Sequence, residues 1–459
     1  MSITQSTTNS GGGNSILSTT GSVSVQSPYS GSAAQQSTGD GTLSLTLADA
    51  LARGLKFNLG ALTQASSVKQ AQGEREVAKS ALLPTVNTEV SEEFERINLR
   101  TTGVESSTFP TASKFNFYDA RAARLEQSVF DLVRTDNLHS ATENLKATMN
   151  GARDSRDLVV LAVGGAYLQL IATQARVSAA QAQVETSRAI DQQAADRLAA
   201  GLAARIDVTR SQVQLQTEQQ RLRSLRADLD TQKLRLARII GLSLGQHFEI
   251  ADSYRYSPVV DLTESAALQL AMERRNDLQA ATSAVKAAEQ SVKAAHAERL
   301  PNLIVSADFG AAGRTPTRHS TGVYSVYGTL TIPLYEGGRI HGDIDQAAAA
   351  LQQRKSEFED LRGQVDQDVR QSFIDLNAAA GQVDVAKSNV ELSHDTLTQS
   401  RDRFDAGIAD TVEVVQAEQA VVQADDDYIT AVYQHNLAKV SLARAVGNAE
   451  QMLPSLMRK

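Results

Sequence analysis

An internal repeat constrains this chain more than any other feature of its sequence. Residues 197–208 match residues 403–414, and the match runs without a gap to a Leu-Ala-Arg triplet near the end of each copy, at 236–238 and 442–444. Both pairs of segments stand 206 residues apart. Self-similarity over such a distance predicts two copies of one structural unit, each roughly 200 residues long.

Each unit is predicted to contain a pair of strands, which follows a helical stretch that ends at a Leu-Pro. In the second unit, apolar and polar residues alternate over two segments, which predicts strands at about 302–313 and 322–335. The corresponding segments of the first unit, at about 85–99 and 115–130, carry several charges. Four strands are too few to close a barrel alone, so closure would require several copies of the chain.

Two long helical segments follow each strand pair. Large residues recur there at every seventh position with small residues three positions later, a pattern typical of closely packed helices. We call these large residues the apolar seam; in the first helical segment of each unit they are Val163, Leu170, Val177 and Val184, and Val369, Leu376, Val383, Val390 and Leu397. Gly201 and Gly407 stand where one helix must end and its antiparallel partner begin.

The repeat also sets the expected domain limits. Residues 1–41 are rich in Ser, Thr, Gly and Gln and contain no recognisable secretory signal, so we expect a disordered tail there. The predicted segments are a tail at 1–42, a first repeat at 43–241, a connector at 242–261, a second repeat at 262–447 and a C-terminal tail at 448–459.

Composition excludes several classes of function. The chain has no Cys, which excludes disulfides, thiolate metal sites and catalysis by Cys, and its net charge of -8 argues against a nucleic-acid partner. The seven His residues form no i, i+4 pair and no nucleophile elbow is present, so we expect no metal site, no cofactor and no enzyme activity. The most apolar stretch, Leu158–Ala172, is too short for a transmembrane helix, so any membrane crossing would fall to strands closed into a barrel.

The repeated motifs resemble those of the TolC-like outer-membrane efflux family. The resemblance covers Leu43 to Gly447, and it rests on the 206-residue duplication and on several short motifs. These are Leu-Ala-Asp-Ala-Leu around Asp49, a Leu-Pro before each strand pair, Ser128-Val-Phe-Asp131, Ile332-Pro-Leu-Tyr-Glu-Gly-Gly338, and the paired Arg-x-x-x-Gly turns.

That resemblance implies a mainly α fold with β-structure, in which three chains form a 12-stranded β-barrel in the outer membrane, continuous with a helical barrel in the periplasm. It implies a passive duct of a tripartite efflux or type I secretion system. The implied partners are two further copies of the chain, a periplasmic adaptor, an inner-membrane pump of the RND or ABC type, and outer-membrane lipid. The alternative is a periplasmic adaptor or structural coiled-coil protein without a pore, although an adaptor usually has one helical hairpin set between β-rich halves.

The resemblance also suggests functional residues at the two glycine turns. The family places acids just after each turn, near the periplasmic mouth, and the matching residues here are Asp207 and Glu413, with Phe404 as a further gate candidate. The residues suggested for adaptor docking are Gly201, Leu202, Gly407 and Ile408. Two simpler interpretations stay open: the acids could be ordinary first-turn residues favoured by the helix dipole, and the glycines could only turn the chain.

Overall fold

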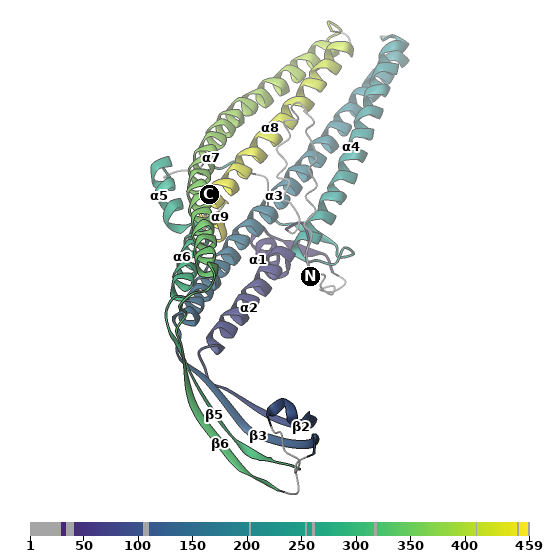
Figure 1. Cartoon of the computed structure of the whole chain (residues 1–459). Helices are drawn as coiled ribbons and strands as arrows, with labels where there is room; N and C mark the ends of the chain where they lie inside the picture. Colours follow the sequence, from purple (N-terminus) through teal and green to yellow (C-terminus); the bar gives the residue numbers. More distant parts are fainter. Residues whose placement is uncertain are drawn as a thin grey trace.

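The computed structural model describes residues 29–33, 41–103, 110–201, 203–252, 255–258, 262–315, 319–409, 411–447 and 449–457. The molecule is elongated, with a curved sheet at one end and two long helical hairpins that run to the other (Figure 1). The mainly helical fold with a smaller β-structured part is therefore confirmed.

The first half of the described chain contains a short strand, two helices, a strand pair and a helical hairpin. Its elements are β1 (Leu43–Leu45), α1 (Leu47–Phe57), α2 (Leu59–Ser80), β2 (Thr85–Asn98), the 3-10 helix η1 (Leu99–Thr102), β3 (Ala112–Phe130), α3 (Leu132–Ala199) and α4 (Arg205–Ile240). At ~1.5 Å per residue, the 68 residues of α3 span roughly 100 Å.

The second half follows the same order and ends with one more helix. Its elements are β4 (Phe248–Ile250), α5 (Glu264–Arg274), α6 (Asn276–Ala297), β5 (Asn302–Gly313), β6 (Ser320–Thr331), α7 (Arg339–Asp405), α8 (Thr411–Ala445) and α9 (Ala449–Met457). The last strand ends before Pro333, a residue that has no N–H to donate to a strand ladder. It is therefore shorter than the predicted segment to 335.

The strands of the two halves form one antiparallel sheet. Its order is β2-β3-β5-β6, so the pair from each half meets at β3 and β5. Cross-strand partners place Phe309 opposite Tyr324 and Ala307 opposite Val326 on one face, and Asp308 opposite Ser325 on the other. One face of the sheet is thus mainly apolar and the other polar.

The apolar seam is buried, except for Val390, which is half-buried. Val163, Leu170, Val369 and Val383 have almost no exposed surface, and they pack in clusters with residues of α4 and α8 such as Leu236 and Leu442. Direct contacts join α3 to α4 and to α8, and α7 to α8. The seven-residue pattern predicted from the sequence is confirmed by this burial, because it places the large residues in the interfaces between helices.

The N-terminal segment departs from its predicted disorder at residues 29–33. Asn58, which is buried between α1 and α2, donates from Nδ2 to the Tyr29 carbonyl at 2.7 Å, and Ser32 forms a β-bridge with Asn58. A Cβ on Gly60 would lie 2.3 Å from the Tyr29 ring, so only glycine permits this approach. Residues 29–33 are held by contacts with Asn58, which lies about 25 residues later in the chain. The polar composition of residues 1–41 does not predict these contacts.

The connector also contains regular structure. β4 pairs in parallel with β1, so residues near both ends of the first half lie side by side. The hydroxyl of buried Tyr167 on α3 lies 2.9 Å from the Leu45 carbonyl oxygen and 2.7 Å from the Asp252 carboxylate. These contacts attach the small sheet to the middle of α3.

Among the described helices, α3 is the one that is long and apolar enough to cross a membrane by length and composition. Its most apolar 18-residue window has a mean hydropathy of 1.6, and 67% of that window is buried inside the chain. Val159, Val163 and Leu170 of this helix pack in the largest described hydrophobic cluster. This burial identifies the stretch as a core helix covered by other helices.

We predict that a charge in the apolar seam prevents assembly. In Leu376→Asp or Val383→Asp, a carboxylate replaces a buried apolar side chain of α7, a class of change that costs several kcal/mol. We expect loss of folded, detergent-extractable protein, measured by circular dichroism and size-exclusion chromatography. Ser388→Asp, at an exposed position on the same helix, is the control. Normal folding of both seam variants would contradict the assignment of Leu376 and Val383 to a packed interface between helices.

Candidate functional site

The candidate residues lie at the ends of the two helical hairpins, furthest from the sheet (Figure 1). α3 ends at Ala199 and α4 begins at Arg205, while α7 ends at Asp405 and α8 begins at Thr411. Gly201 and Gly407 have φ values of 73° and 71°, the left-handed region that glycine adopts without strain. The predicted turning role of both glycines is therefore confirmed, whereas Leu202 lies outside the described residues.

Asp207 acts within its own helix. Its carboxylate accepts a hydrogen bond from the Ala204 backbone N–H at 3.2 Å, and it lies 3.9 Å from the Arg210 guanidinium. This is the contact of a first-turn acid that satisfies a free N–H at a helix start. Asp207 is therefore an acid that caps the start of its own helix, and part of its side chain remains exposed.

Glu413, the counterpart of Asp207 in the second unit, is bound differently. Its carboxylate lies 3.0 Å from Nε of Arg403, near the end of the preceding helix. This ion pair joins the two helices of one hairpin close to their turn. Because both side chains are largely exposed, the pair contributes little to stability.

Phe404 lies inside the helix packing. It is buried in a cluster with Ile190 of α3, Leu397 of α7 and Val414 of α8. A buried ring does not line an opening, so in this structure Phe404 packs the two hairpins together. Ile408, by contrast, is 71% exposed at the turn.

Arg197 joins the tips of the two hairpins, a role that the sequence did not reveal. Its guanidinium carbon lies 4.5 Å from the centre of the Phe404 ring, and it donates a hydrogen bond to the Phe404 carbonyl. The repeat places Arg197 and Arg403 at equivalent positions, yet Arg197 reaches the other hairpin and Arg403 stays within its own. The only signal in the sequence was that both copies of the turn motif begin with Arg.

Two buried carboxylates lie a few turns from the tips, where the hairpins pack together. Glu418 of α8 is 1% exposed; the Ser187 hydroxyl lies 3.4 Å from its carboxylate and the Arg401 guanidinium lies 4.0 Å away. Glu218 of α4 is 4% exposed and accepts a hydrogen bond from Gln214 at 3.0 Å. Burial is the main cause that raises the pKa of Glu418 to about 7, and the charge of Glu218 raises it further, while Arg401 lowers it. Burial also raises the pKa of Glu218.

Comparison with known proteins identifies the family. The model of the outer membrane efflux protein family matches residues 60–242 and 267–448, which together make up most of the chain. The chain belongs to this family. Each matched range covers one half of the chain, and each half has its own strand pair and its own long helical hairpin.

Individual relatives of this outer membrane efflux protein are distant in sequence and close in structure. It is 24% identical over 403 residues to the pyoverdine export outer membrane protein OpmQ of Pseudomonas putida, covering 84% of this chain and 82% of that protein. It is 23% identical over 350 residues to the outer membrane protein TolC of Escherichia coli, covering 72% and 69%. The crystal structure of VceC from Vibrio cholerae superposes with a TM-score of 0.75 at 18% identity, covering 87% of this chain and 96% of that one.

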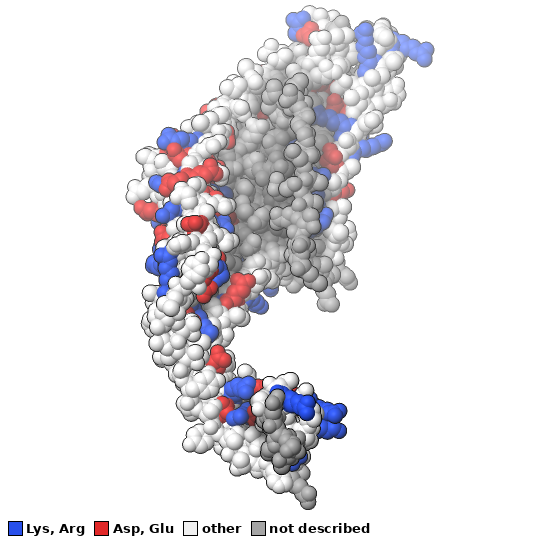
Figure 2. Space-filling view, in the orientation of Figure 1, with Lys and Arg blue, Asp and Glu red and all other residues white. Residues whose placement is uncertain are grey.

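Family membership fixes the general function. This outer membrane efflux protein is a channel of the outer membrane for efflux or secretion, with its helical part in the periplasm, and it is not an enzyme. Among the described residues, no group of three or more His, Asp or Glu side chains could hold a metal ion. On the face that Figure 2 shows, acidic and basic side chains are interspersed along α7.

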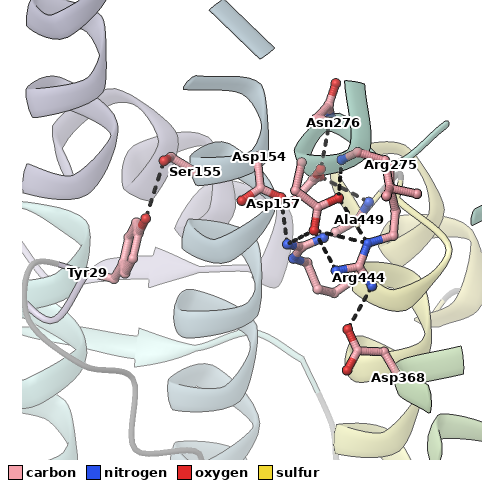
Figure 3. A network of polar contacts seen from close by, with 11 residues as sticks. Tyr29, Asp154, Ser155, Asp157, Arg275, Asn276, Asp368, Arg444 and Ala449 are labelled. Atoms are coloured by element: carbon pink, nitrogen blue, oxygen red, sulfur yellow. Dashed lines mark hydrogen bonds and ion pairs between the residues drawn. The ribbon is translucent and has the colours of Figure 1, made fainter. Parts of the chain in front are cut away.

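A largely buried network of ion pairs joins the helices at the base of the hairpins, with Asp368 at its exposed edge (Figure 3). Arg444 of α8 contacts Asp154 of α3 at 2.5 Å and Asp277 of α6 at 3.6 Å. Arg275, which precedes α6, contacts Asp277 at 2.6 Å and Asp368 of α7 at 2.7 Å. Burial raises the pKa of Asp154 to about 6 although Arg444 lowers it. Arg275 is buried, so removal of its partner Asp277 would leave an unpaired buried charge and be destabilising, whereas Asp368 is half exposed and contributes less.

We predict that Glu418→Gln removes a pH dependence of stability. The pKa of Glu418 is about 7 in the folded chain against an ordinary 4.5, so its stabilising contribution is complete below the ordinary value and is lost as the pH rises through 7. The thermal midpoint of the wild-type protein in detergent should therefore fall relative to the variant between about pH 5 and pH 8. Glu391→Gln, at an exposed position, should behave as wild type. An equal fall in wild type and Glu418→Gln would contradict the prediction.

Proposed function

We propose that three copies of this chain assemble into one continuous duct, with a 12-stranded barrel in the outer membrane and a helical tunnel in the periplasm. The observation that carries this proposal is the sheet itself. Among the described residues, β2 and β6 each have a strand partner on one side only, so one chain presents two open edges. Open edges are not tolerated in lipid, since no water is present to satisfy their N–H and C=O groups. Head-to-tail pairing of β6 with β2 of the next copy removes every edge.

The division of the sheet into two faces supports the same arrangement. The apolar face exposes Phe309, Tyr324, Val326 and Leu330, which is the composition of a surface in contact with lipid. The opposite face holds the ion pair between Arg121 and Asp308, as expected of a wet lumen. The ends of the strands furthest from the helices would then open to the outside of the cell.

The helical part leaves an apolar surface for neighbouring copies. Large residues that are exposed in the single chain recur along α7 and α4; they are Ile374, Val385 and Leu392, and Ile206, Val213 and Leu234. Scattered exposed apolar residues are ordinary, but these follow helices that would lie at the sides of each protomer. A trimer would cover them.

The duct would act together with a periplasmic adaptor and an inner-membrane pump. The adaptor would dock on the exposed hairpin tips, where Ile408 presents an apolar side chain beside Gly407, with Gly201 and Leu202 at the other tip. Asp207 and Glu413 would line the periplasmic mouth, where threefold symmetry supplies up to six carboxylates that attract cations. One relative is named for pyoverdine export and another for alkaline protease secretion, which supports a duct for exported small molecules or proteins.

We predict a homotrimer in mild detergent. Native mass spectrometry should give a particle of three chains of 49.2 kDa each, because only closure pairs the edges of β2 and β6. A monomer or dimer as the main folded species would argue against the proposal. So would a folded protein that stays in solution without detergent.

We predict that Asp207→Asn combined with Glu413→Gln reduces cation preference of the pore. Asn keeps an acceptor for the Ala204 N–H, so the helix start is preserved while the charge is lost. In planar bilayers we expect a lower cation-to-anion permeability ratio and weaker block by multivalent cations. The control removes two exposed carboxylates further from the tip, Glu391→Gln and Asp395→Asn. Unchanged selectivity and unchanged block would contradict the prediction. Asp207 would then only cap its helix, and Glu413 would only pair with Arg403.

A further inference from the structure

The polar face of the sheet can be assigned residue by residue on β2 and β3. Arg121 contacts Asp119 at 2.8 Å and also contacts Asp308, while Arg124 contacts Glu89. These contacts place all five charged side chains on one face. Alternate residues along each strand continue that face toward the far end of the sheet.

Two phenylalanines interrupt this polar face. Phe117 and Phe115 follow Asp119 at spacings of two residues, so they lie on the same side as the ion pairs. Phe117 is 63% exposed and Phe115 is 40% exposed. An aromatic belt at the membrane surface does not explain them, because belt residues belong on the opposite face, where Phe94 and Tyr118 lie.

Each of these rings lies directly opposite a carboxylate. The register pairs Phe117 with Glu93 and Phe115 with Glu95 across β2 and β3. Cβ atoms of such partners are about 4.5–5.5 Å apart, so the ring and the carboxylate can contact one ligand together. Within the described part of the chain, neither Glu93 nor Glu95 forms an ion pair or a side-chain hydrogen bond, unlike Glu89 next to them on the same face.

We propose that these two pairs, Phe117 with Glu93 and Phe115 with Glu95, form a binding site for organic cations with apolar substituents in the outer half of the lumen. The site rests on the proposed trimeric barrel, in which threefold symmetry would repeat it three times around the wall. A ring face attracts a cation and an adjacent carboxylate neutralises its charge, while the apolar substituents cover phenyl surface that water otherwise wets. A small inorganic cation lacks the apolar part, and an anion is repelled by the carboxylates. The site therefore selects among molecules in transit by both charge and apolar area.

The experiment measures block of single-channel current in planar bilayers by tetraphenylphosphonium. Added on the side of the strand loops, it should block wild-type channels, whereas tetramethylammonium and naphthalenesulfonate at the same concentration should not. Glu93→Gln with Glu95→Gln should raise the half-blocking concentration about tenfold or more, a loss that corresponds to ~1.4 kcal/mol. Phe117→Leu should raise it several-fold, since leucine keeps apolar volume and loses the ring face.

Matched controls come from the opposite face of the same strand. Glu92 and Phe94 neighbour Glu93 and Glu95 along β2, but their side chains lie on the lipid-facing side of the sheet. Glu92→Gln and Phe94→Leu should leave the half-blocking concentration unchanged. Open-channel conductance without blocker, together with trimer mass, shows that each variant is assembled.

The outcomes separate the two proposals. Absence of trimers or of any channel in the wild-type protein would overturn the proposed duct, and the site with it. Normal channels with no block by tetraphenylphosphonium, or with block that Glu93→Gln, Glu95→Gln and Phe117→Leu leave unchanged, would overturn the binding site alone. Equal loss of block in the Glu92→Gln control would also overturn it, because a general change of surface charge would then explain the effect.

Discussion

Burial of apolar side chains at every seventh position holds the long helices together, and the placement of every other part depends on it. Seam residues such as Val163 and Val369 fix how α3 and α7 pack against α4 and α8. Because these helices are long, the glycine turns lie far from the sheet. The hairpin tips and the sheet are therefore separate surfaces at opposite ends of the molecule. The small residues between the large ones let the helices approach closely, which leaves little room for polar groups in the interfaces.

The few polar groups that do lie in those interfaces are therefore informative. Glu418 and Glu218 are buried between the hairpins near their tips, and the ion pairs of Arg275 and Arg444 lie near their base. Burying charge is unfavourable unless it is paired, so the base network, which has close partners, favours one arrangement of four helices, α3, α6, α7 and α8. The upper pair has weaker partners, and one of its carboxylates gains a proton near neutral pH.

The two hairpins carry matching residues at equivalent positions of the sequence, but their packing gives those residues different contacts. Arg197 and Arg403 occupy the same position in the repeat, but only Arg197 contacts the other hairpin, over the ring of Phe404. The repeat counterpart of Phe404 is Leu198, which has no ring face to offer a guanidinium. Phe404 therefore allows Arg197 of the first hairpin to contact the second hairpin, while Leu198 offers no equivalent ring to Arg403.

The sequence by itself determined the repeat, the strand pairs, the buried seam and the two glycine turns, because each depends on local periodicity or on backbone conformation at one residue. Only the tertiary structure decided that Phe404 is buried, that Asp207 and Glu413 have different partners, and that residues 29–33 pack against Asn58. It also decided which face of the sheet carries Phe115 and Phe117, because an irregularity in the strand register near Glu89 interrupts the simple alternation. The packing of Phe404 against α3 and of residues 29–33 against Asn58 joins residues far apart in the chain, and periodicity along one segment holds no information about what lies across from it.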